Sequence, residues 1–89
     1  MKAMTVHESL TRARKAYRIG DYNLAEKMLL NAVERNPRMS LVYNFLGSVY
    51  DKLGKYEQAI QQIKRAIELK QDFTEAYNNL GVVLRKIDR

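Results

Sequence analysis

The chain has 89 residues, a length that allows one small domain with a modest core. It contains no cysteine, which excludes a disulfide framework and any thiolate-based site. No apolar run approaches the roughly 18 residues of a membrane span, and no apolar segment typical of a secretory signal follows the first residues. These features predict a cytoplasmic domain.

The basic charge is the strongest bias in the composition. The net charge is +6 at pH 7. A basic surface attracts nucleic acid, anionic lipid or acidic peptide, or it simply keeps the fold solvated. Because lysine and arginine are scattered along the chain rather than clustered, solvation is the interpretation that we favour for most of them.

The first predicted helix covers residues 6–19. Thr5 and Glu8 have the three-residue spacing of a capping box, in which each side chain satisfies the backbone N–H of the other residue. Gly20 is the expected end, since glycine adopts the left-handed cap conformation at little cost. The inward face follows helical spacing and consists of Leu10, Ala13, Ala16 and Tyr17.

The second predicted helix begins after Asp21, a favourable N-cap residue, and continues to about Arg35. Asn36 and Pro37 end it, because proline disfavours helical geometry in the residue before it. Its apolar stripe consists of Tyr22, Ala25, Met28, Leu29, Ala32 and Val33.

The third and fourth predicted helices cover about 40–53 and 56–69, with Gly54 in the turn between them. Gly47 lies in the middle of the third helix, where glycine costs about 1 kcal/mol relative to alanine. Close approach of a neighbouring helix is the usual reason to keep a glycine at such a place. The sequence therefore predicts a tight helix contact at Gly47.

The fifth predicted helix is expected to begin after Asp72 as N-cap, with Glu75 three residues later. It carries Tyr77, Leu80 and Leu84, which would pack on a sixth helix if the array continued. An uncovered apolar patch usually marks an interaction surface. Three arrangements remain open: a longer array, self-association of two copies, or a last helix that swings to cover the patch. We favour self-association through these three residues.

The same residue types recur at positions thirty-four residues apart, and a fixed period of this length indicates a solenoid repeat. The helix-turn-helix unit with this spacing resembles the tetratricopeptide repeat (TPR) family. The resemblance rests on three sets of residues. They are Ala13, Gly20, Tyr22, Ala25, Ala32 and Pro37, then Tyr43, Leu46, Gly47, Tyr50, Gly54, Tyr56, Ala59 and Ala66, then Tyr77, Leu80 and Gly81.

The resemblance implies an all-α fold, an α-solenoid of antiparallel helix pairs that forms a right-handed superhelical TPR array. It implies two and a half repeats in five helices within a single domain, 1–89. The first repeat would cover about 6–39, the second about 40–73 and the half repeat about 74–89. Ser9 and Arg12 depart from the family pattern, and so does Gln71, which stands where a closing proline is usual.

In this family the first helix of each pair lines a concave face that holds an extended peptide. Carried over by position, the peptide-binding groove would consist of Leu10, Arg14, Tyr17, Arg18, Leu41, Asn44, Ser48, Asp51, Lys52, Asn78, Val82 and Arg85. His7, Glu75 and Lys86 occupy equivalent positions, and Asn79 is adjacent to them. Arg18, Lys52 and Lys86 would form a ladder of cations. Because arginine binds carboxylates through two parallel hydrogen bonds, we expect a peptide of acidic character.

One subclass of the family holds the carboxylate tail of chaperones in a clamp of basic and asparagine side chains. The matching positions here are occupied by Leu10, Arg14, Phe45, Glu75 and Asn79. This set lacks the required lysine and asparagine pattern, so the sequence argues against that subclass.

No catalytic chemistry is evident in the sequence. His7 is the only histidine, and the isolated glycines form no phosphate-binding loop. We therefore expect no enzyme activity, no cofactor and no metal. The leading hypothesis is a protein-interaction scaffold that binds a peptide. The alternatives are an oligomerisation module that uses the fifth helix and, less favoured, a nucleic-acid-binding protein.

Overall fold

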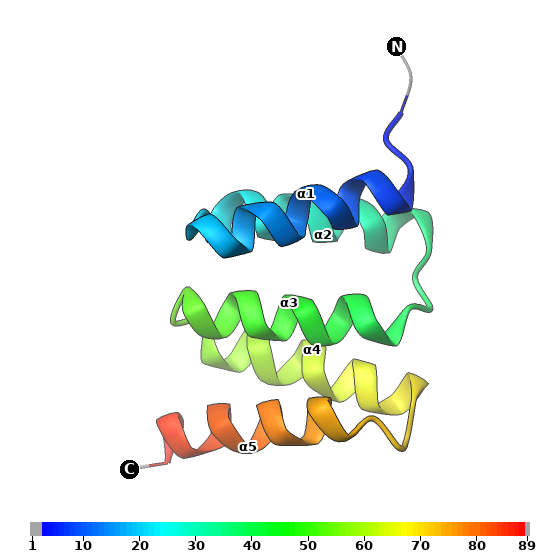
Figure 1. Ribbon diagram of the computed structural model, residues 1–89. Coiled ribbons are helices and arrows are strands. Elements are labelled where there is room, and N and C mark those ends of the chain that lie inside the picture. The colour runs from blue at the N-terminus through cyan, green and yellow to red at the C-terminus, as the bar shows by residue number, and fades with distance from the viewer. Residues whose placement is uncertain (1–2, 89) are drawn as a thin grey trace.

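The computed structural model describes residues 3–88 and contains five helices in sequence. They are α1 (Val6–Ile19), α2 (Tyr22–Arg35), α3 (Ser40–Lys52), α4 (Tyr56–Leu69) and α5 (Thr74–Ile87). Figure 1 shows them stacked in layers, with α1 and α2 at one end, α3 and α4 in the middle and α5 at the other end. The helices pack mainly as the pairs α1–α2 and α3–α4, and α5 packs on α4. The shape is elongated, 48 × 27 × 17 Å.

The helix ends follow from local signals in the sequence. Thr5 and Glu8 form the predicted capping box, and the Thr5 backbone N–H that donates to the Glu8 carboxylate lowers the pKa of that group. Gly20, with a φ angle of 87°, is the C-cap residue of α1. Gly54, with a φ angle of 75°, lies in the turn directly after α3. The Asp21 carboxylate accepts from the Leu24 backbone N–H, as expected of an N-cap.

The predicted cap of the last helix is wrong. α5 begins at Thr74, its N-cap residue is Phe73, and no side chain caps it. Phe73 is 6% exposed, so its ring enters the core, whereas Asp72 is left on the exposed turn. The same arrangement occurs one repeat earlier, where the partly buried Met39 is the N-cap residue of α3. Burial of an apolar N-cap side chain thus determines the residue at which α3 and α5 each begin.

Gly47 lies where two helices meet closely. A Cβ on Gly47 would overlap Cγ1 of Ile63 in α4 and would stand 3.3 Å from the carbonyl oxygen of Ala59. Both Ile63 and Ala59 are fully buried. The close α3–α4 approach that the mid-helix glycine predicted is therefore present.

Gly81 occupies the equivalent place in α5 but makes no such contact. The nearest atom to a Cβ built on it is Nη1 of Arg85, at 3.9 Å. Gly81 differs from Gly47 in this respect because, within residues 3–88, no helix packs on this face of α5.

Tyrosine hydroxyls brace the turns that precede α3 and α5. Tyr43 donates to the Pro37 carbonyl at 2.8 Å, and Tyr77 donates to the Gln71 carbonyl at 3.2 Å. Both bonds span six residues, and both end on the position where the family places a closing proline. The absence of proline at Gln71 therefore leaves this bond intact.

Ser9 holds the corresponding place in α1. Its side chain is fully buried, and its hydroxyl donates to Oδ1 of Asn31 in α2 at 2.7 Å. A polar pair thus replaces the large ring of the other repeats. Buried polar groups need such a partner, because an unpaired hydroxyl would cost free energy.

The core runs continuously through the pairs rather than forming one central cluster. Its largest fully buried side chains include Leu29 in α2, Leu46 in α3 and Ile63 in α4. Burial raises the pKa of Tyr50 in α3 to about 12, and the Glu26 carboxylate of α2 adds to the shift. Among the described residues, no helix has the length and apolar character needed to cross a bilayer.

Candidate peptide-binding groove

The first helix of each pair contributes to a shared hollow. α1, α3 and α5 lie in order along the stack, with α3 between the other two (Figure 1). A pocket of about 250 Å³ opens where these three helices meet. We call it the groove pocket, and its lining consists of Leu10, Arg14, Leu41, Asn44, Phe45, Ser48, Glu75 and Asn79.

The groove pocket gathers part of the predicted binding set. Six of its lining residues occupy positions predicted for the groove, namely Leu10, Arg14, Leu41, Asn44, Ser48 and Glu75. The other predicted positions lie outside it: Tyr17, Arg18, Asp51, Lys52, Asn78, Val82 and Arg85. The groove pocket also includes all five positions that match those of the carboxylate clamp, namely Leu10, Arg14, Phe45, Glu75 and Asn79.

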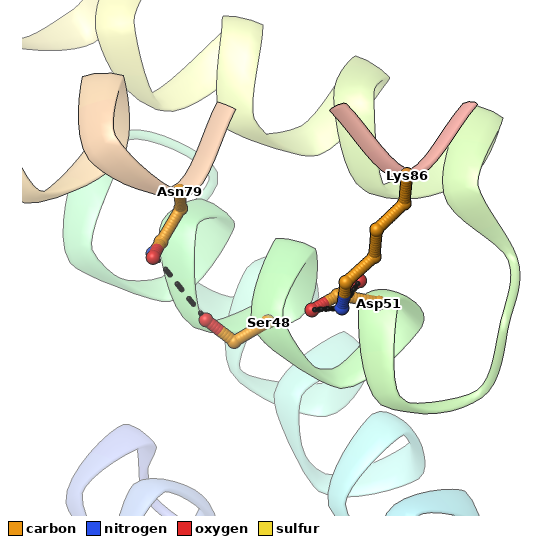
Figure 2. Close-up of polar contacts among 4 residues, drawn as sticks. All are labelled: Ser48, Asp51, Asn79 and Lys86. Carbon is orange, nitrogen blue, oxygen red and sulfur yellow. Dashed lines mark hydrogen bonds and ion pairs between the residues drawn. The ribbon is translucent and has the colours of Figure 1, made fainter. Parts of the chain in front are cut away.

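Polar contacts join α3 to α5 at one side of the groove pocket. Nδ2 of Asn79 donates to Oδ1 of Asn44 at 3.0 Å and to Oγ of Ser48 at 3.4 Å, the second of which is drawn in Figure 2. Asn44 is only 6% exposed. The Asn44 oxygen is therefore engaged with Asn79, and its partner is the adjacent Asn79 rather than Asn78 of the thirty-four-residue register.

An ion pair joins the same two helices about two turns further along α5. Nζ of Lys86 lies 2.8 and 3.0 Å from the two carboxylate oxygens of Asp51 (Figure 2). The hydrogen bond to Asp51 raises the pKa of Lys86, as expected when a neighbouring anion favours the charged form. Lys86 thus serves to tie α5 to α3, which changes its predicted role in a ladder of cations.

Aromatic rings connect the first repeat to the second beside the groove pocket. Tyr17 packs edge-on against Phe45 and Tyr22, with ring centroids 5.5 and 5.4 Å apart. Edge-to-face pairs of this kind stabilise by about 0.5–1.5 kcal/mol beyond their buried area. Phe45 was not predicted as part of the groove. Its spacing of four residues from Leu41 was the signal, since such residues share a helix face.

The remaining predicted groove positions are open to solvent. Arg18, Lys52 and Asn78 are exposed, and Val82 is 37% exposed. Arg85 bends back along α5 toward Gly81, as its 3.9 Å approach to that position shows. These side chains flank the groove pocket without lining it.

The outer face of α5 has the apolar exposure that the sequence suggested. Tyr77 is 50% exposed and Leu84 is 45% exposed, while Leu80 is partly buried against the core. Ile87, also 45% exposed, extends this face toward the end of the helix. We call Tyr77, Leu80 and Leu84 the α5 patch.

Comparison with known proteins identifies the family. The model of the TPR repeat family matches residues 47–87. The Arabidopsis OM64 TPR domain has a TM-score of 0.92 at 19% identity, and the alignment covers 96% of this chain and 70% of that one. The repeat in the sequence and the match to the TPR repeat model agree, and the chain belongs to the tetratricopeptide repeat family. The similarity to the solved structure shows that the fold is the same.

The chain spans about a fifth or less of the length of two relatives that it matches. A "Protein STIP1 homolog" from Dictyostelium discoideum is 31% identical over 87 residues, and a "Protein SGT1 homolog" from Oryza sativa subsp. japonica is 27% identical over 78 residues. The alignments cover 98% and 88% of this chain but only 15% and 21% of those relatives.

Similar solved structures include TPR domains with a bound peptide. The first TPR of Spaghetti (RPAP3), bound to the HSP90 peptide SRMEEVD, has a TM-score of 0.91 at 25% identity. The alignment covers 96% of this chain and 68% of that one.

Proposed function

We propose that the chain is a protein-interaction scaffold that binds an extended peptide of acidic character across α1, α3 and α5. The observation that carries the proposal is the groove pocket, which combines exposed apolar surface with charged and amide side chains from all three helices. The similarity to a TPR domain that holds a peptide supports the same use of this face. The proposed partner is a protein or peptide.

The acidic character of the ligand rests on an excess of cations on this face. Arg14, Arg18, Lys52 and Arg85 are exposed, whereas Lys86 is paired with Asp51. Among the predicted groove positions, Glu75 is the remaining anion. Exposed arginine and lysine side chains steer and bind carboxylates, with each exposed pair contributing about 0.2–1 kcal/mol.

Three further features belong to the same proposal. The chain acts by binding and not by catalysis, in keeping with the general role of this fold. It is organised as the repeats 6–39 and 40–73 and the half repeat 74–89. The proposed location is the cytoplasm, which the absence of cysteine favours.

Reversing two groove charges should weaken binding of an acidic peptide. We expect Arg18→Glu combined with Lys52→Glu to reduce the affinity for a capped Glu-Glu-Leu-Glu-Glu peptide by roughly tenfold or more, because two attractions become repulsions. Fluorescence anisotropy with the labelled peptide at low salt measures this. A capped Gln-Gln-Leu-Gln-Gln peptide should bind both proteins more equally.

The matched control places the same charge change on the other helices. Lys27 in α2 and Lys64 in α4 are exposed, and neither lines the groove pocket. The double variant Lys27→Glu and Lys64→Glu should retain most of the affinity. Equal losses in the two double variants would mean that overall charge, and not the groove, attracts the peptide. No loss in the groove variant would refute the proposal.

A second candidate function is self-association through the α5 patch. The observation that favours it is the exposure of Tyr77 and Leu84 beside Gly81, which has no close neighbour on that face among residues 3–88. We expect the molar mass measured by light scattering to rise with protein concentration, and we expect Leu84→Glu to abolish the rise. A constant monomer mass at the highest concentrations would exclude this function for the chain.

A further inference from the structure

The groove pocket has an apolar floor that is open to solvent. Leu10 and Phe45 form it together with Leu41, which is 56% exposed. An exposed leucine beside a hollow of about 250 Å³ offers an apolar side chain a place to bury itself. Pockets for whole drug-sized ligands span about 300–1,000 Å³, so this one suits a single side chain of a larger ligand.

Opposite charges border this floor. Arg14 comes from α1, and Glu75 comes from the first turn of α5, on the far side of α3 (Figure 1). Neither forms an ion pair with any residue in 3–88. Both charged groups are therefore available to a ligand, and the rim of the pocket is cationic toward α1 and anionic toward α5.

The wall between these charges is fixed before any ligand arrives. Asn79 is hydrogen-bonded to Asn44. Figure 2 shows its bond to Ser48 and the ion pair of Lys86 with Asp51, about two turns further along α5. These contacts join α3 and α5, the helices that supply Leu41 and Glu75. A pocket whose walls are already braced loses little conformational freedom on binding, which favours affinity.

We propose that the groove pocket takes one apolar side chain of a bound peptide that carries an acidic residue on the Arg14 side and a basic residue on the Glu75 side. This inference rests on the proposed peptide-binding function and specifies its ligand. Glu75 would repel a second acidic residue or a free terminal carboxylate placed beside it. The preferred partner is thus an internal segment with mixed charge around an apolar anchor.

The spacing of the ligand residues follows from helix geometry. Packed helices lie about 8–10 Å apart. Because α3 lies between α1 and α5 and α1 packs chiefly on α2, at least about two such spacings separate α1 from α5. An extended peptide advances by about 3.3–3.6 Å per residue, so charges about four residues apart, reached by long side chains, span this distance. Capped peptides with the pattern Glu-Ala-Leu-Ala-Lys, in either order of the charges, are suitable probes.

The experiment compares three capped peptides by fluorescence anisotropy. They carry Glu-Ala-Leu-Ala-Lys, Glu-Ala-Leu-Ala-Glu and Glu-Ala-Ala-Ala-Lys. We expect the first to bind about tenfold more tightly than the second, because an attraction replaces a repulsion at Glu75. The third lacks the anchor and should bind roughly 10-fold to 100-fold more weakly than the first, since it forgoes burial of a leucine side chain.

Variants of the protein assign the effect to the pocket. Glu75→Lys should reverse the preference, so that Glu-Ala-Leu-Ala-Glu becomes the better ligand. Glu34→Lys makes the same charge change on the exposed surface of α2 and should leave the preference as it was. Leu41→Ala should remove most of the advantage of the leucine anchor, whereas Leu30→Ala, at a 45% exposed site on α2, should not.

The outcomes separate this inference from the function on which it rests. Equal binding of the mixed and the doubly acidic peptides, or a preference that Glu75→Lys does not change, would overturn the inference. The groove proposal would then still stand on the reversal of Arg18 and Lys52. A protein that binds none of the three peptides would also overturn the inference, and the titration with Glu-Glu-Leu-Glu-Glu would decide the groove proposal independently.

Discussion

Ile63→Ala is expected to reduce the free energy of unfolding by about 2–5 kcal/mol, the range typical of large-to-alanine changes in a core. Ile63 is fully buried in α4, and its Cγ1 lies against the backbone of α3 at Gly47. Gly47 has no side chain that could move into the space left behind. The cavity therefore stays open, which places the expected loss toward the upper part of the range. Urea unfolding followed by helical circular dichroism measures it.

The matched control is an isoleucine at the surface. Ile87 in α5 is 45% exposed, so Ile87→Ala should cost less than about 1 kcal/mol because much less apolar area is lost. Similar losses for Ile63→Ala and Ile87→Ala would contradict the close α3–α4 packing. A change in the slope of the unfolding transition would signal altered cooperativity instead of a simple loss of stability.

Alanine substitution of the two helical glycines is expected to have opposite effects. At Gly81 a Cβ meets only the flexible end of Arg85, so Gly81→Ala should stabilise the chain by up to about 1 kcal/mol through helix propensity. At Gly47 a Cβ would overlap buried Ile63, and overpacking of this kind costs about 1–3 kcal/mol. That cost exceeds the same propensity gain, so Gly47→Ala should be destabilising. Thermal unfolding of the two variants compares them directly.

A double-mutant cycle tests the cause of the Gly47 effect. Ile63→Ala removes the Cγ1 atom that a Cβ at position 47 would overlap. In that background Gly47→Ala should become neutral or stabilising, because the new methyl group enters the cavity. Residues in contact commonly show coupling of about 0.5–3 kcal/mol. Additive effects of the two substitutions would show that they do not share this space.

Much of the architecture was predictable because the signals are local. Gly20 and Gly54 end helices through backbone conformations that glycine adopts readily, and the capping box at Thr5 depends on residues three apart. The mid-helix Gly47 predicted a close contact without identifying Ile63 as its partner. The thirty-four-residue spacing then supplied the family and the order of the helices.

The start of α5 was not predictable from capping rules alone. Asp72 is a favourable N-cap residue, but the N-cap is the next residue, Phe73, because its ring is drawn into the core. The free energy gained by burying an aromatic ring exceeds the roughly 1 kcal/mol of a typical cap. The equivalent Met39 before α3 carried this information in the sequence.

The hydrogen bonds and the ion pair between groove side chains were also not predicted from the sequence. Their positions in the repeat predicted that Asn44 and Lys86 would be available to a ligand. Instead, Asn44 bonds to Asn79 and Lys86 bonds to Asp51, each across a separation of thirty-five residues. Such pairs depend on the relative rotation of α3 and α5. A register of thirty-four residues predicts which positions are equivalent but not which side chains meet between neighbouring repeats.

The most direct test of the central claim is to map where an acidic peptide binds. Amide resonances of the ¹⁵N-labelled chain can be followed by NMR during titration with the capped Glu-Glu-Leu-Glu-Glu peptide. The account predicts that the largest shifts fall on α1, α3 and α5 around Arg14, Leu41 and Ser48. Shifts concentrated on α2 and α4, or at Tyr77 and Leu84 on the α5 patch, would contradict it.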